Sequence, residues 1–230
     1  MKNPFLDFRS VPFQKKKDRS DTIRRSRQEV TDRIFKSYTF LVGEEIKDLG
    51  WLIEPARVSR AYATALKSIE GLEYDQKDIE DFCSELDISD RVRYMISGPA
   101  GIFISALVNN AKEDRIILGK VSLREFHFMG YRLPEGKVLT IQGDVGDFAG
   151  AGLAGGRLII EGAAGNWCGT GMAKGKITVA KGTGKDLGEW MQGGEIHVDG
   201  RIWGLAKNCV AGRIYHKGKL IFTNTSGETS

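Results

Sequence analysis

The sequence predicts an α+β chain in which an N-terminal helical bundle precedes a short, right-handed, single-stranded parallel β-helix. Glycines recur with a 19-residue step between Gly136 and Gly212, and apolar residues keep the same step. Apolar residues with helical spacing mark the N-terminal half instead. A fixed short period is typical of a solenoid, in which each repeat stacks on the last. The alternative is a β-sandwich with accidental spacing.

Both glycine and apolar positions form columns at this step. The glycine columns are Gly136, Gly155, Lys174, Gly193 and Gly212; Gly143 and Gly162; Gly146, Gly165 and Gly184; and Gly150, Gly169 and Gly188. The apolar columns are Leu139, Leu158, Ile177, Ile196 and Tyr215; Ile141, Ile160, Val179 and Val198; Ala149, Cys168, Leu187 and Ala206; and Leu153, Met172, Met191 and Val210. The β-branched runs within them predict short strands, since one coil has no room for an ordinary helix. We expect the apolar columns to face inward and the glycines to form corners, where φ is positive or backbones approach closely.

Three phrases of the ladder resemble a known repeat: Gly143-Asp-Val-Gly146-Asp-Phe-Ala-Gly150-Ala-Gly152-Leu-Ala-Gly155-Gly156, then residues 161–172, then 188–200. They look like the GXGXG repeat, which occurs in the C-terminal domain of the glutamate synthase large subunit and in one of the subunits of formylmethanofuran dehydrogenase. The resemblance covers about the last hundred residues. It implies a right-handed parallel β-helix with an architectural role and no established catalytic residue. The ladder here is short, and the N-terminal half matches neither family.

Four regions are expected along the chain. Residues 1–19 form a basic extended arm, 20–115 a helical domain, 116–222 the GXGXG parallel β-helix, and 223–230 a disordered tail. The predicted helices begin at Ser20 or Asp21 and end at Gly43 or Gly50; run from Pro55 to Gly71; span Asp75–Leu86; run from Ser89 or Asp90 to Ile96; and, after an interruption at Ser97–Gly101, span Ile102–Ala111. Arg124–Met129 is strand-like. The helical half is a natural cap for the first coil, and Gly218–Phe222 either closes the far end or leaves it for a partner.

The totals exclude several classes of protein. The chain has 230 residues, a net charge of +4 and three cysteines, which is too few and too scattered for a disulfide framework or a zinc pattern. Cys168 lies in an inward column and is expected in the core. The N-terminus lacks a signal peptide, and the apolar run Ile102–Val108 is too short to cross a bilayer, so we expect a cytoplasmic protein with no membrane partner.

Two patterns suggest small ligands but fit poorly. Gly150-Ala-Gly152-Leu-Ala-Gly155 matches a dinucleotide fingerprint, yet a strand rather than a helix is expected to follow, so no cofactor is predicted. His197 and His216 are 19 residues apart, so that the two imidazoles, with Asp199 nearby, would share a metal ion if they stacked. No third ligand keeps the register, and two exposed histidines are the favoured interpretation.

Two further features concern partners. The segment Lys15–Arg27 is strongly basic but lacks interleaved aromatic residues, so a solvated helix start or a protein-docking arm is favoured over nucleic-acid binding. Trp167, Trp190 and Trp203 are either anchors for a partner or covers for the glycine corners, and the sequence leaves both open.

The function predicted from these observations is structural. The chain is expected to be a non-catalytic scaffold that binds a protein partner or a second copy of itself, within an assembly of the oxidoreductase or amidotransfer type. No catalytic, cofactor-binding or metal-binding residue is assigned. One alternative is a free-standing enzyme that acts at the corner loops around Asp144, Asp147 and Asn166, or at His197 and His216. A second alternative is nucleic-acid binding through the basic arm.

Overall fold

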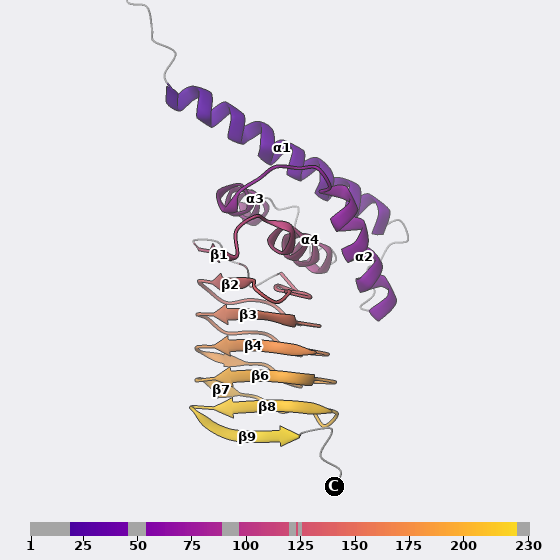
Figure 1. Ribbon diagram of the computed structural model, residues 1–230, viewed down its shortest axis with the longest axis vertical. Helices are drawn as coiled ribbons and strands as arrows, with labels where there is room; N and C mark the ends of the chain where they lie inside the picture. Colours follow the sequence, from indigo (N-terminus) through magenta and orange to yellow (C-terminus); the bar gives the residue numbers. More distant parts are fainter. Residues whose placement is uncertain (1–18, 46–53, 89–96, 120–122, 124–125, 225–230) are drawn as a thin grey trace, which may run out of the picture.

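A computed structural model describes residues 19–45, 54–88, 97–119, 123 and 126–224, with the helices at one end of a stack of strands (Figure 1). The helices are α1 (Arg19–Glu45), α2 (Pro55–Ser68), α3 (Gln76–Ile88) and α4 (Ser97–Asn110). The strands are β1 (Arg115–Leu118), β2 (Val138–Ile141), β3 (Ala154–Ile160), β4 (Lys174–Val179), β5 (Gly182–Thr183), β6 (Gln192–Val198), β7 (Arg201–Ile202), β8 (Ala211–His216) and β9 (Lys219–Asn224).

The strands form a parallel β-solenoid of about five turns over residues 115–216. Its main sheet has the order β1-β2-β3-β4-β6-β8-β9, and every pair in it is parallel except the last. Leu139, Leu158, Ile177 and Ile196 are register partners and all are fully buried. The predicted parallel β-helix and its inward apolar column are therefore confirmed. Its right-handedness stays a prediction.

The 19-residue step is not kept everywhere, and two predicted columns are wrong at this point. Strand β4 has one more residue than the step allows, so the corner glycine after Gly155 is Gly175 rather than Lys174. Between β6 and β8 one residue is lost, so Ile196 pairs with Ile214 and not with Tyr215. The second irregularity also exposes the end of the fourth column, because Val210 is 43% exposed while its buried counterpart in the last coil is Ala211.

Each coil turns one corner through three left-handed residues that alternate along the chain. In the second coil they are Phe148, Gly150 and Gly152, with φ of 61°, 68° and 61°. The same positions hold Phe128, Gly130 and Arg132; Trp167, Gly169 and Gly171; and Asp186, Gly188 and Trp190. Positive φ costs an L-residue roughly 1 kcal/mol or more, which explains the glycines here. The rings of Phe128, Phe148 and Trp167 stack with centroids 4.7 and 4.9 Å apart, and this contact offsets part of that cost.

The N-terminal half is helical, as predicted, and its helices pack around one apolar core. Pro55 is the first residue of α2, where its missing N–H costs nothing. The expected interruption at Ser97–Gly101 is wrong, since α4 begins at Ser97 and Pro99 lies in its first turn, where proline is tolerated. Gly43 lies inside α1 and does not end it. The helix expected before Ile96 lies outside the described residues.

Helix α4 lies directly against the first corner of the solenoid. A Cβ on Gly101 would overlap the carbonyl group of His127, and Ser105 Oγ donates to the carbonyl oxygen of Phe128 over 2.9 Å. The strand expected at Arg124–Met129 is wrong for its described part, because Phe128 has a φ of 64° and forms a corner. The helices thus cover the first coil, and β1 adds a coil that the 19-residue step does not reveal, since Ile116 pairs with Leu139.

The other end of the solenoid has a thinner cover. Strand β9 folds back antiparallel on β8 and, within the part of the chain that the structure describes, has no strand on its outer edge (Figure 1). The tail expected to start at Thr223 begins later, because Thr223 and Asn224 belong to β9; residues 225–230 lie outside the described range.

Candidate functional site

The corner carboxylates and amide proposed as an enzyme site connect neighbouring coils. Asp144 Oδ1 accepts from the Ala163 N–H over 2.9 Å, and Asp147 Oδ1 accepts from the Asn166 N–H over 2.7 Å. Asn166 Oδ1 in turn accepts from the Lys185 N–H over 2.8 Å. The sequence placed these side chains correctly at corners. Their hydrogen bonds give them a structural task and lend no support to catalysis there.

The two histidines are not stacked on one another. The lost residue between β6 and β8 places Tyr215 beside His197, with ring centroids 4.3 Å apart, and places His216 beside Val198. His216 Nε2 lies 2.8 Å from the carbonyl oxygen of Gly200. The shared-metal hypothesis is therefore contradicted for this pair. Within the described residues, no group of three or more histidine, cysteine, aspartate or glutamate side chains is arranged to hold a metal ion.

His197 instead belongs to a charged group centred on Glu195. His197 Nε2 lies 3.0 Å from Glu195 Oε2, and Arg213 Nη2 lies 2.8 Å from Glu195 Oε1. The hydrogen bond with His197, followed by the charge of Arg213, lowers the pKa of the Glu195 carboxyl. A carboxylate held ionised in this way is a poor general acid or base at neutral pH.

The cysteines are not poised for nucleophilic chemistry. Cys168 is fully buried, as predicted, and burial raises the pKa of its thiol to about 12. Burial also raises the pKa of Cys83 and, less completely enclosed, of Cys209. Because the thiolate is the reactive form, raised pKa values disfavour a catalytic role.

The glycines of the dinucleotide-like sequence form a solenoid corner. Gly150, Gly152 and Gly155 all have positive φ, and strand β3 begins at Ala154 within the sequence itself. The expectation that a strand follows is confirmed. A phosphate site of this type needs a helix N-terminus after the glycines, and none lies there.

The tryptophans separate into two groups. Trp167 stacks on Phe148 and covers a corner, while Trp190 and Trp203 are 55% and 63% exposed. Of the basic segment, Arg27 belongs to α1 and contacts α3, with Nη2 3.2 Å from Asp75 Oδ2. The residues before Arg19 lie outside the described range.

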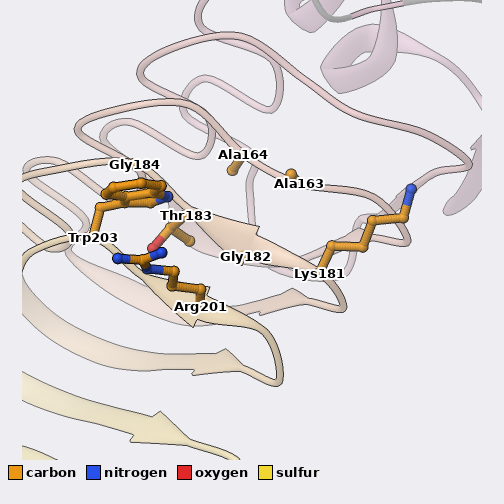
Figure 2. A pocket seen from close by; sticks show the side chains of 8 residues that line it. All are labelled: Ala163, Ala164, Lys181, Gly182, Thr183, Gly184, Arg201 and Trp203. Atoms are coloured by element: carbon orange, nitrogen blue, oxygen red, sulfur yellow. The ribbon is translucent and has the colours of Figure 1, made fainter.

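A hollow of about 340 Å³ lies over the two-stranded sheet of β5 and β7 (Figure 2). The Arg201 guanidinium carbon is 3.9 Å from the centre of the Trp203 ring, and Thr183 lies beside this pair. Lys181 extends away from them and approaches Asp144 to 3.7 Å. The lining holds cationic and aromatic groups but no nucleophile with an adjacent base, so it suits contact with a carboxylate rather than catalysis. The 19-residue spacing from Gly182 to Arg201 was the available sequence signal for this second sheet.

The hollow borders a larger exposed apolar surface. The exposed large apolar side chains among the described residues number eight, and six of them lie between Trp190 and Ile221. These six are Trp190, Trp203, Leu205, Val210, Leu220 and Ile221. We call the surface formed by residues 190 and 199–224 the C-terminal face. Between 199 and 224 it has more arginine and lysine residues than acidic ones, of which Asp199 is the single example.

Neither a family model, nor a curated protein, nor a solved structure matches the chain. The GXGXG resemblance therefore stays a prediction. Among the helices that the structure describes, none combines the length and the apolar character required to cross a membrane.

Proposed function

We propose that the protein is a non-catalytic scaffold that binds a protein partner through its C-terminal face. The observation behind this proposal is the unequal cover of the two solenoid ends. Four helices lie over the first coil, whereas six of the eight exposed large apolar side chains of the described residues gather at the last coils. Solenoid ends need a cap, and a partner protein supplies one where the chain does not.

The chemistry of the face favours one kind of partner. Trp203 and Leu205 present apolar area, and tryptophan is enriched among residues that dominate binding energy. Arg201 and the exposed Lys207, Lys217 and Lys219 surround that area with positive charge. Like charges oppose a second copy of the same face, so the proposed partner has an apolar patch with acidic residues around it.

The proposed setting is a larger assembly of the oxidoreductase or amidotransfer type, with the chemistry in the partner. Only the resemblance to the GXGXG repeat supports this finer statement. The alternative of a free-standing enzyme finds no support in the corner residues, whose polar atoms bond to neighbouring coils.

The experiment is a comparative co-purification from the cells that make the protein. The double variant Trp203→Ser/Leu205→Ser is compared with the wild type and with Phe40→Ser/Ile117→Ser, which removes exposed apolar side chains (54% and 45% exposed) away from the face. We expect the wild type and the control to retain the same stoichiometric protein, and the double variant to bind it roughly 30-fold more weakly, as for the loss of about 2 kcal/mol. Raising the salt concentration should also weaken binding.

Three results would contradict the scaffold. They are the absence of any stoichiometric partner at low salt, equal retention by the double variant, and loss of the partner in the control. Circular dichroism of each variant, compared with the wild type, shows that the solenoid is intact.

A further inference from the structure

A groove of about 380 Å³ runs between α2 and the corners of the first three coils. Figure 1 shows α2 beside the upper strands, on the side where β2, β3 and β4 begin. Val58 and Ser59 form its helical wall, and Phe128, Phe148 and Thr170 belong to three successive corners. Its size is at the small end of the range for ligand pockets, which is roughly 300–1,000 Å³.

Glycine at one corner position leaves this groove open. The third left-handed residue of each corner is Arg132, Gly152, Gly171 and Trp190 in successive coils. Both large residues lie in the outer coils, and both glycines lie between them. A Cβ on Gly171 would meet nothing within 4 Å, so the space beside it is empty.

The groove is apolar except at one end. The parallel rings of Phe128 and Phe148, 4.7 Å apart, provide an aromatic wall. Of the residues that line the groove in the described part of the chain, Arg132 alone is charged. The pattern is that of a small-molecule site, in which apolar contacts supply area and one polar group fixes orientation.

Arg132 is held in place by its surroundings. Its guanidinium carbon is 5.3 Å from the centre of the Tyr131 ring and 6.0 Å from that of Tyr62, and Nη2 is 3.4 Å from Ser59 Oγ. Asn109 Nδ2 fixes both tyrosines by donating to Tyr62 Oη over 2.8 Å and to the Tyr131 carbonyl over 3.0 Å. Arg132 also has a φ of 51°, and strained residues of this kind cluster at ligand sites.

Two further features of the groove lack partners for hydrogen bonding. Helix α2 opens at Pro55 on the groove wall, and Glu54 before it makes no side-chain cap, so the positive end of the helix is free for an anion. Thr170 lines the groove, and its hydroxyl oxygen is buried with no hydrogen-bond partner in the described part of the chain.

We propose that this groove binds a small, flat aromatic carboxylate. The ring of the ligand packs against Phe128 and Phe148, and its carboxylate accepts hydrogen bonds from the Arg132 guanidinium. The geometry of an arginine fork matches a carboxylate, and the aromatic wall matches a planar ring. The groove lies at the helical end of the solenoid, so this inference is independent of partner binding at the C-terminal face.

The probe for this site is 2-naphthoate, measured by isothermal titration calorimetry on the full chain. The uncharged 2-acetylnaphthalene is the matched ligand control. Arg132→Gln removes the charge, and Arg157→Gln removes an exposed arginine on the outer side of β3 as the protein control. Ser59→Phe fills the groove from the helix, where a larger side chain replaces no core residue.

We expect one naphthoate per chain, bound roughly tenfold more weakly by Arg132→Gln, since a hydrogen bond to a charged group contributes about 1.5 kcal/mol or more. Arg157→Gln should bind like the wild type, and Ser59→Phe should not bind. Binding of 2-acetylnaphthalene should be weaker than that of naphthoate and unchanged by Arg132→Gln. The proposal is overturned if naphthoate does not bind, if Arg132→Gln binds it as well as the wild type does, or if both naphthalenes bind equally. If Ser59→Phe does not fold, the two arginine variants decide the result.

Discussion

At the start of the solenoid, α4 places fully buried side chains such as Phe103 and Leu107 in the core that continues into the first coil. At its end, β8 is followed in the described chain by β9, whose Leu220 and Ile221 are 49% and 43% exposed. Both ends have the same need, because a terminal coil presents unpaired backbone groups and apolar columns. Within the described residues, this need is met with four helices at one end and with a single strand at the other. The difference suggests that the second end is adapted to a partner.

The difference between interior and open end should appear most strongly in the apolar columns. Ile196→Ala removes a fully buried side chain from the middle of the stack and should lower the free energy of unfolding by about 4 kcal/mol. Val210→Ala, at 43% exposure, should lower it by about 0.5 kcal/mol or less. Urea unfolding followed by circular dichroism measures both. Similar losses in the two variants would mean that the last coil is as well covered as the interior.

The contact between α4 and the first corner predicts the next largest effect. Gly101→Ala places a Cβ against the His127 carbonyl and should cost about 2 kcal/mol through overpacking, because backbone atoms yield little. Gly43→Ala in α1 meets nothing within 4 Å and should stabilise by about 0.5 kcal/mol, as expected for alanine within a helix. Thermal and urea unfolding distinguish the two signs. A harmless Gly101→Ala would show that α4 does not rest on the solenoid.

The cross-coil hydrogen bonds at the corners predict a smaller effect. Asn166→Ala leaves the Lys185 N–H without its acceptor and should cost about 1 kcal/mol. Asn166→Asp keeps an oxygen at the same place, as Asp147 does one coil earlier, and should recover most of that loss. If both variants lose equal stability in urea, the side-chain oxygen is not the group that matters.

The smallest expected effect concerns pH at the last coils. The folded state lowers the pKa of Glu195, so its contribution to stability is present above the unfolded value near 4.5 and is lost as pH falls through the folded pKa. Glu195→Gln should therefore be less stable than the wild type at pH 7, and the gap should close towards pH 3. Unfolding in urea at both pH values measures it. A gap that is equal at both would exclude the ionised carboxyl as the cause.

The sequence predicted the interior of the solenoid well because each coil repeats the same constraints. Leu158, Ile177 and Ile196 must face inward, and the corner positions of Gly150, Gly169 and Gly188 require positive φ, so period and chemistry agree. The prediction failed where the period changed by one residue. Lys174 and Tyr215 were misplaced for this reason, because a bulge shifts the register without leaving a mark in composition.

The groove and the C-terminal face were harder to predict. Arg132 comes 20 residues before Gly152, so a strict 19-residue step did not place it at a corner. The groove also depends on where α2 packs, which periodicity does not determine. Trp203 was noted in the sequence, but its exposure follows from its place beside β7, the last strand of the two-stranded sheet in the described chain.

The most direct test of the account is hydrogen exchange on the protein alone and in complex with the partner that it retains at low salt. We expect the amides of β2, β3, β4 and β6 to exchange slowly in both states, and those of β9 to exchange quickly in the free protein. Binding should slow exchange over residues 199–224 and leave the helices unchanged. Protection that appears on α1–α4 instead, with residues 199–224 unaffected, would contradict the proposal that the C-terminal face is the docking surface.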